Sequence, residues 1–475
     1  MRAFLKHLSL IIGVLLIVTS MFLARSTLQE YRRRNGLYWY DVEKSYEYRF
    51  DSKAVTRVPV VVDDSGFEWP ANAAPCETAL LRASLSSHRS GYWFEPGVRI
   101  STSGLDPFTQ HFERGGHGTR YLNVSPICRA GAAAGDHISI SAEHATVRSG
   151  SGELLLFRDP VLSGKRLLVL APHPDDAEIA AFALYRENVS TIVTATVGGY
   201  VNRAYTHLVD DPSKTTALLG RLRTWDSISV PIWGGVSPEH SVALGYLGGA
   251  LETMYAESGS ESSEERGATE AVRAYRSMNS SSLLRPGAVS SWESLVADLV
   301  YVIERIEPAI IALPHPVLDV SREHRLTSLA LLQALAYVEG QDAQLLLYNN
   351  HHLYSEYWPY GPADSLMTLP PWFGDINLRS FGSVYSHVVD REAQVDKLLA
   401  LDAMHDLRAP SRAHRGDPTI RMLRWFRRTA DEMWQDPHRY YSYFRRAPRP
   451  NELFFVVEPE GRAALQEAAL EALSQ

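Results

Sequence analysis

A short apolar run that ends abruptly in polar residues, Leu167 to Ala171, most constrains what this chain can fold into. Five consecutive apolar residues are typical of a strand covered on both faces, because a strand with one face in water alternates apolar and polar residues. The run leads at once into His173, Asp175 and Asp176, and an alanine-rich helical segment follows. The sequence therefore predicts an α/β unit with three polar side chains at the carboxyl end of a buried strand, where open α/β sheets bind ligands.

The polar turn has two interpretations. Asp175 and Asp176 occupy the positions of an N-cap and a first-turn acid, where carboxylates stabilise a helix without any chemistry. That interpretation leaves His173 unexplained. A histidine and an aspartate three residues apart can share one divalent metal ion, so a metal site is the alternative.

A second segment repeats this design further along the chain. An apolar run from Ala309 to Leu313 precedes a Pro-His-Pro loop, and the segment Glu323-His324-Arg325 opens the helix that follows. One histidine from this segment would complete a set of two histidines and one aspartate. Three protein ligands leave one coordination position for water, as in catalytic zinc sites.

The motif Ala-Pro-His-Pro-Asp-Asp, followed at a distance by Pro-His-Pro and an acid-His-Arg segment, resembles that of the PIG-L/LmbE-like zinc-dependent de-N-acetylases. The resemblance covers Lys165 to His405, about half of the chain. It implies an α/β fold with a Rossmann-like parallel sheet. It also implies that His173, Asp176 and His324 bind one Zn²⁺ per chain, with Asp175 as the general base.

The second motif departs from the pattern of the family at Ser321, where a further histidine is common. The segment Tyr348-Asn-Asn-His351-His352 follows the next apolar run and resembles another element of the family. We predict that His351 replaces the missing histidine as the catalytic group that assists the oxyanion or the leaving group. A structural hydrogen-bonding role for His351 is the alternative.

Five further residues are candidate substrate contacts. Paired glycines after the second predicted strand allow a ligand to approach the backbone closely, and a plain turn is the alternative. An Arg-Thr-Trp-Asp sequence resembles an Arg-x-x-Glu element of the family, and an ion pair on a helix surface is the alternative. The five candidates are Gly198, Gly199, Arg223, Arg325 and His352.

Composition divides the remainder of the chain. We expect a membrane anchor with its flank at 1–30, a β-rich domain at 31–160, the deacetylase-like domain at 161–408 and a basic, aromatic helical extension at 409–475. The β-rich domain is predicted from short β-branched and aromatic runs separated by turn residues, which are typical of a β-sandwich. Its aromatic run, Tyr92 to Phe94, could stack on sugar rings, although core packing is the more common use of aromatic residues.

The amino-terminal segment from Leu8 to Ala24 carries no charge. It is short for a membrane span and long for the core of a signal peptide, and no small-residue cleavage site follows. We therefore predict a single-pass anchor in a bacterial inner membrane, with an orientation that the flanking arginines leave open. The two cysteines, Cys76 and Cys128, favour a disulfide and a periplasmic body, with unpaired thiols and the cytoplasmic face as the alternatives.

The expected function follows from the resemblance and from charge. A net charge of -8 argues against nucleic acid as a partner, because phosphate binding needs a basic face. The resemblance implies hydrolysis of the N-acetyl group of an N-acetylated amino sugar, and the predicted anchor favours a cell-envelope glycolipid or polysaccharide such as lipopolysaccharide core. A non-catalytic envelope glycan-binding protein and a zinc amidohydrolase of a non-sugar amide are the alternatives.

Overall fold

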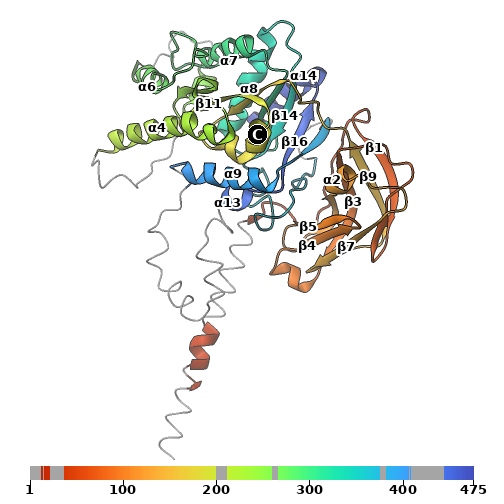
Figure 1. Ribbon diagram of the computed structural model, residues 1–475. Coiled ribbons are helices and arrows are strands. Elements are labelled where there is room, and N and C mark those ends of the chain that lie inside the picture. Colours follow the sequence, from red (N-terminus) through yellow and green to blue (C-terminus); the bar gives the residue numbers. More distant parts are fainter. Residues whose placement is uncertain are drawn as a thin grey trace, which may run out of the picture.

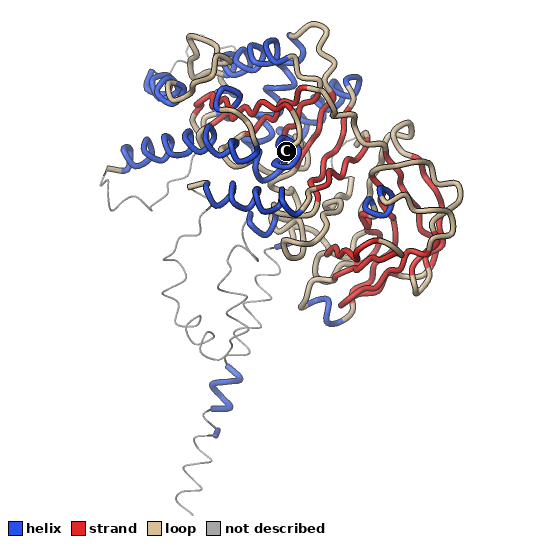
Figure 2. The backbone as a smooth tube through the Cα atoms, viewed as in Figure 1, coloured by secondary structure: helices blue, strands red, loops and turns tan. Residues whose placement is uncertain are grey.

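The structure is a computed structural model, and it describes residues 12–13, 15–21, 37–198, 211–258, 266–374, 381–405, 407 and 443–475. Two lobes are visible within these residues (Figure 1). The amino-terminal lobe consists mainly of strands, whereas the larger lobe has a central sheet with helices on both sides (Figure 2).

The amino-terminal lobe contains two antiparallel sheets that share one apolar core. Strand β1 shows why a sheet forms here, since Val58, Val60 and Val62 are buried while the residues between them are exposed. The first sheet comprises β1 (Thr56–Val62), β9 (Gly150–Phe157), β3 (Thr78–Ser87), β6 (His117–Asn123) and β8 (Ala145–Val147). The second comprises β2 (Gly66–Glu68), β7 (His137–Glu143), β4 (Gly97–Thr102) and β5 (Leu105–His111).

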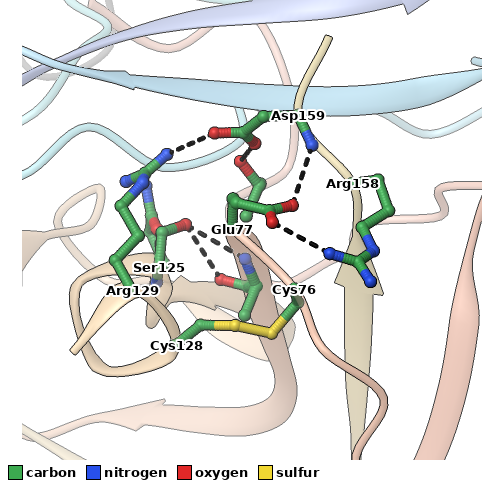
Figure 3. Close-up of a disulfide and its surroundings, with 10 residues drawn as sticks. Cys76, Glu77, Ser125, Cys128, Arg129, Arg158 and Asp159 are labelled. Atoms are coloured by element: carbon green, nitrogen blue, oxygen red, sulfur yellow. Dashed lines mark hydrogen bonds and ion pairs between the residues drawn. A yellow bond between two sulfur atoms is a disulfide. The ribbon is translucent and has the colours of Figure 1, made fainter. Parts of the chain in front are cut away.

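The predicted disulfide between Cys76 and Cys128 is present, and its two Cα atoms lie 6.0 Å apart. It joins the residue that precedes β3 by two positions to helix α2 (Ser125–Arg129). Two ion pairs flank the bridge (Figure 3): Arg129 with Asp159 at 3.0 Å, and Arg158 with Glu77 at 2.9 Å. The bridge and the Arg129–Asp159 pair connect α2 to the segments beside β3 and β9, and the Arg158–Glu77 pair joins those two segments.

Two residues of the aromatic run in this lobe are exposed to solvent, whereas aromatic residues are usually buried. Trp93 and Phe94 follow the short helix η1 (Arg89–Tyr92), and they are 49% and 60% exposed. Phe94 stacks on His144 with the ring centroids 5.0 Å apart. Core packing, the more common use of aromatic residues, therefore does not account for Trp93 and Phe94.

The larger lobe is organised around a seven-stranded sheet with the order β12-β11-β10-β13-β14-β16-β15. Strand β10 (Arg166–Ala171) lies in the interior of the sheet and is buried on both faces, because Leu168 and Leu170 belong to one apolar cluster and Leu167 and Val169 to another. The other strands are β11 (Val189–Thr196), β12 (Ser241–Tyr246), β13 (Ile310–Pro314), β14 (Gln344–Tyr348), β15 (Ser383–Val388) and β16 (Asn451–Val457).

Helices cover both faces of this sheet (Figure 1). Helices α7 and α8 contribute to the apolar cluster on one face, and α3 and α9 contribute to the cluster on the other. The helices of the lobe are α3 (Asp176–Arg186), α4 (Pro212–Ser229), α5 (Leu251–Ala256), α6 (Arg266–Arg276), α7 (Trp292–Ile306), α8 (Arg322–Tyr337), α9 (Arg391–Ala403), α13 (Tyr443–Arg446) and α14 (Arg462–Ser474).

The two lobes share part of their apolar core. Tyr48 of the amino-terminal part packs against Tyr121 of the same part and against Phe381 and Phe455 of the larger lobe, and all four rings belong to one cluster of buried residues. The Tyr48 hydroxyl also donates a hydrogen bond of 2.8 Å to the backbone oxygen of Pro370. The β-rich part is therefore packed on the larger lobe over an apolar contact.

The predicted fold class, a Rossmann-like parallel sheet, is corrected by the strand pairing. Parallel pairs occur between β12, β11, β10, β13 and β14, whereas β16 and β15 run antiparallel. All pairs of the amino-terminal sheets are antiparallel, so antiparallel pairs predominate among the described strands. The direction of β16 has a local cause: α13 lies beside the residues that follow β14 and ends only five residues before β16 begins. The chain thus enters the sheet from the carboxyl edge, and a parallel strand would require a longer crossover.

The prediction of a membrane anchor, and with it the single-pass inner-membrane location, is also corrected. A membrane-spanning helix needs about 20 consecutive apolar residues. Across the residues that the structure describes, no helix reaches the length and apolar character that crossing a membrane requires. Part of the predicted span, and residues 409–442 of the predicted basic helical extension, lie outside the described residues. The remainder of that extension contains β16 as well as α13 and α14.

Candidate metal centre

The carboxyl ends of β10 and β13 bring the two predicted metal motifs together. These strands are parallel neighbours, so the loops that follow them emerge at the same edge of the sheet. His173 lies in the loop after β10, Asp176 begins α3, and His324 lies in the first turn of α8. One ligand atom from each of these three residues lies within 4.8 Å of the others, and the group could hold a metal ion.

The three ligand atoms are almost equally spaced. His173 Nδ1 and Asp176 Oδ2 are 3.3 Å apart, His324 Nε2 and Asp176 Oδ2 are 3.3 Å apart, and the two histidine nitrogens are 3.2 Å apart. Asp176 and His324 are buried, while the His173 side chain is 17% exposed. The three ligand atoms therefore surround a common centre, and His173 is the most exposed residue of the group.

Each histidine of the group is held by a carboxylate at its other ring nitrogen. Asp319 Oδ2 lies 2.9 Å from His324 Nδ1, and Glu323 Oε2 lies 2.7 Å from His173 Nε2. Such carboxylate partners fix the tautomer of a metal-binding histidine, because they require the proton on the nitrogen that faces away from the metal. The sequence pattern does not assign a role to either carboxylate, although both lie in the segment that carries the second motif.

Asp176 is held by two donors. The Asn350 side chain donates to Asp176 Oδ1 at 2.8 Å, and the His173 backbone N–H donates to Oδ2 at 2.9 Å. Burial alone would raise the pKa of Asp176, but the imidazoles of His324 and His173 outweigh it and lower that pKa well below its usual range. Asp176 is therefore an anion with a fixed orientation, as a metal ligand requires.

Asp175 has a different environment from its neighbour. It precedes α3 but makes no capping hydrogen bond, so the interpretation as a helix N-cap does not account for its side chain. Its φ of +137° lies in a region that residues with a side chain rarely adopt, and such strain is typical of functional sites. Burial and the carboxylate of Asp176 raise the pKa of Asp175 to about 6.

His351 lies beside the group, and its ring centroid is 5.0 Å from that of His324. Its Nδ1 is 3.1 Å from both carboxylate oxygens of Glu356, and its Nε2 is 3.2 Å from the hydroxyl of Tyr443. Burial alone would lower the pKa of His351, but Glu356 and Asp319 outweigh it and raise that pKa above its ordinary value. His351 thus has the position of a proton donor beside the metal group, and its raised pKa favours the protonated form.

Gly198 and Arg223 fit against each other at the end of β11. The Arg223 Nε donates to the backbone oxygen of Val197 at 2.7 Å. A Cβ atom at Gly198, whose φ is +73°, would lie 2.7 Å from the Arg223 guanidinium. A close contact inside the protein therefore explains this glycine without a ligand. Gly199 lies outside the described residues.

The last two candidates hold loops together. Arg325 donates to the backbone oxygens of Ala472 at 2.8 Å and Val317 at 3.3 Å. His352 is buried, and its Nε2 lies 2.9 Å from the backbone oxygen of Pro371. Burial lowers the pKa of His352 to about 3, so its imidazole is neutral. These contacts give both residues a structural use.

Comparisons with known proteins give no family match and only weak structural likenesses. No family model matches the chain, and no curated protein matches it. Among solved structures, GalB, the 4-carboxy-2-hydroxymuconate hydratase from Pseudomonas putida KT2440, is similar with a TM-score of 0.29 and 12% identity, over 62% of this chain and 97% of that one. A family two carbohydrate esterase from Cellvibrio japonicus has a TM-score of 0.16 and 10% identity, over 63% and 90% of the two chains. Xylanase10C from Cellvibrio japonicus has a TM-score of 0.16 and 8% identity, over 77% and 86%. These likenesses are too weak to support an argument about function.

Proposed function

We propose that this protein is a zinc-dependent hydrolase that removes the N-acetyl group from an N-acetylated amino sugar. The observation that carries the proposal is the convergence of His173, Asp176 and His324 on one centre. Asp175, whose backbone is strained, precedes Asp176 directly in the chain. The sugar as substrate class comes from the resemblance of the two motifs to the de-N-acetylase family.

The spacing and chemistry of the ligand atoms support zinc. A tetrahedral ion with bonds of about 2.0 to 2.1 Å has ligand atoms roughly 3.3 Å apart. The three distances in this group are 3.2, 3.3 and 3.3 Å. Two imidazole nitrogens and one carboxylate oxygen also suit zinc better than magnesium or calcium, which prefer oxygen ligands.

The number of ligands supports a catalytic site. Structural zinc sites are closed by four protein ligands, whereas catalytic sites have three and leave one position for water or substrate. Within the described part of the chain, the group has three side chains that could bind a metal, and the His173 side chain is partly exposed to solvent. Zinc bound here would supply Lewis acidity and lower the pKa of a water ligand to about 7.

The residues around the group supply the proton transfers of amide hydrolysis. Asp175, with a pKa of about 6, is ionised at neutral pH and can accept the proton of the water that attacks the acetamide carbonyl. His351, whose pKa is raised, can donate a proton to the leaving nitrogen. The C–N bond then breaks, and acetate and the free amine leave.

The strain at Asp175 argues against a protein that only binds glycans. A positive φ at a residue with a side chain costs about 1 to 3 kcal/mol, and it persists only where the surrounding structure enforces it. Asp175 makes no capping bond that would offset this cost. A base that must point at a reacting water explains the strain, whereas a binding surface elsewhere on the protein does not.

An acetate-release assay with the zinc-loaded protein tests the proposal. N-acetylhexosamine conjugates and N-acetylated glycans should release acetate, and an Asp175→Asn variant should keep its zinc while losing roughly 10²- to 10⁴-fold in rate. Asp63→Asn is a matched control, because Asp63 lies in an exposed turn of the amino-terminal lobe. Full activity of Asp175→Asn, or acetate release from non-sugar amides alone, would refute the proposal.

A further inference from the structure

A single helical turn from near the carboxyl terminus lies against the candidate site. Helix α13 follows the part of the chain that resembles the de-N-acetylases, so the resemblance assigns it no role. Its first residue, Tyr443, is partly buried, and its hydroxyl lies 3.2 Å from His351 Nε2. The two rings meet edge to face, with centroids 6.0 Å apart.

Four residues form a closed set of contacts at this point. Glu356 holds His351 at Nδ1, with both carboxylate oxygens at 3.1 Å. Arg446 lies 3.6 Å from Glu356 Oε2, and its guanidinium covers the Tyr443 ring at 4.7 Å. The His351 ring is therefore held at both nitrogens, by a carboxylate on one side and by a hydroxyl on the other.

The opposite side of α13 is fastened inside the protein. Arg445 and Arg449 are buried, and they donate to the backbone oxygens of residues in the loop that follows Glu356. The Arg445 guanidinium lies 2.6 Å from the oxygen of Tyr357, and that of Arg449 lies 2.9 Å from the oxygen of Gly361. Buried guanidinium groups need such partners, since an unpaired buried charge is very unfavourable. The turn is thus anchored to the same loop that supplies Glu356.

The direction of the contact follows from the chemistry of the two partners. Burial raises the pKa of Tyr443 well above its usual range, so its hydroxyl keeps its proton. Because Glu356 accepts a hydrogen bond from Nδ1–H, neutral His351 has its lone pair on Nε2. This nitrogen then accepts a hydrogen bond from the Tyr443 hydroxyl. Once His351 is protonated, Nε2–H donates to the Tyr443 oxygen. Tyr443 can therefore hold the ring in both protonation states, and its hydrogen bond with Nε2–H must open when that proton passes to the leaving nitrogen.

The Tyr443 hydroxyl also lies within electrostatic reach of the acidic groups of the site. The carboxylates of Asp175 and Asp176 both raise the pKa of the Tyr443 hydroxyl, which requires them to be near it. The contact between Tyr443 and Nε2 fixes the orientation of the imidazole ring, which lies beside His324 of the metal group.

We propose that Tyr443 is a positioning residue for the hydrolysis, and that α13 forms one wall of the site. The role in hydrolysis rests on the proposed function, whereas the contact with His351 can be tested without any substrate. Removal of one neutral hydrogen bond lowers an equilibrium or a rate by roughly fivefold to tenfold. A Tyr443→Phe variant should accordingly lose about that factor in kcat, with KM changed by less than about twofold.

The test compares Tyr443→Phe with a matched variant, Tyr48→Phe. Tyr48 donates a buried hydrogen bond of 2.8 Å to the Pro370 oxygen in the contact between the lobes, so this variant also loses one hydroxyl. The ¹⁵N resonance of His351 Nε2, assigned from the signal lost in His351→Gln, should shift in Tyr443→Phe and remain unchanged in Tyr48→Phe. Zinc content and Tm show whether each variant is folded.

The outcomes separate the inference from the proposed function. An unchanged Nε2 resonance in a folded Tyr443→Phe variant would refute the contact, and a shifted resonance with unchanged kcat would refute the positioning role. If the unmodified zinc-loaded protein releases no acetate, the proposed function is refuted, and the role of Tyr443 in the reaction is refuted with it. The Nε2 resonance would still test the contact between Tyr443 and His351. An equal loss of kcat in Tyr48→Phe would show that the loss comes from lower stability of the fold, and it would also overturn the inference.

Discussion

Replacement of Asp319 by asparagine should weaken metal binding without unfolding the protein. Asp319 is fully buried and accepts hydrogen bonds at both carboxylate oxygens. Its Oδ2 lies 2.9 Å from His324 Nδ1 and 3.3 Å from the His351 backbone nitrogen, and its Oδ1 lies 2.9 Å from the Ser321 backbone nitrogen. An asparagine has only one acceptor oxygen, so its NH₂ group must face an N–H group in either orientation.

The two orientations of the amide determine the size of the effect. If the NH₂ group faces His324, the proton of that imidazole moves to Nε2, which then cannot bind a metal. If it faces Ser321, the His324 tautomer is correct but the negative charge that strengthens the ligand is lost. Partners of this kind are worth about 10- to 100-fold in metal affinity. The expected loss of binding free energy is therefore about 1.4 to 2.7 kcal/mol.

A competition titration with a chromophoric zinc chelator measures this affinity directly. The matched control is Glu323→Gln, which alters the partner of His173 instead. The Glu323 and His173 side chains are 20% and 17% exposed, so water can replace the lost partner and the affinity should fall by less than about tenfold. If Asp319→Asn is folded and binds zinc within threefold of the unmodified protein, the assignment of Asp319 as the partner of a metal ligand is wrong.

Three further predictions concern stability and metal dependence. The double variant Cys76→Ser/Cys128→Ser should lose about 4 kcal/mol of unfolding free energy, because the bridge closes a loop with a sequence separation of 52, and an unchanged urea midpoint would contradict this. Burial lowers the pKa of His315 and of His352 to about 3, so below pH 6.5 only the unfolded chain takes up these protons. The contribution of these two histidines to the free energy of unfolding should therefore be fully present above about pH 6.5 and fall toward pH 3, by up to roughly 1.4 kcal/mol per pH unit for each histidine. His352→Gln should remove one such contribution, measured by urea unfolding at pH 7, 6 and 5. Dialysis against a chelator should abolish acetate release and lower Tm, zinc but not magnesium should restore both, and activity that persists in metal-free protein would exclude the metal from the reaction.

The local sequence was sufficient to predict a feature wherever the chemically relevant side chains and the secondary structure that positions them lie within a few residues of each other. The apolar run at Leu167 to Ala171 predicted a strand buried on both faces, and the structure has that strand. His173 and Asp176 are only three residues apart, so the strand and the turn together fix their relative position. The second motif repeats the same design on β13, the parallel neighbour of β10, so its histidine arrives at the same edge of the sheet.

The predictions that failed depended on relationships across the whole molecule. A continuous apolar run is compatible with a parallel sheet, but it does not show that β16 enters from the opposite direction because α13 precedes it at the carboxyl edge. Composition predicted a membrane anchor and a helical carboxyl-terminal extension, and the structure corrected the first and placed a strand in the second. The exposure of Trp93 and Phe94 depends on where η1 lies, and base rates for aromatic residues do not contain that information.

The sequence by itself determined the candidate ligand set of this protein, because two strand-to-loop motifs carry the residues whose chemistry suits a metal. Only the tertiary structure decided how these ligands are held and what surrounds them. Asn350 reaches Asp176 across 174 positions of the chain, and Tyr443 reaches His351 across 92. The physical reason is that a hydrogen bond depends on separation in space over a few ångströms, whereas sequence patterns report only on neighbours within a strand or a turn.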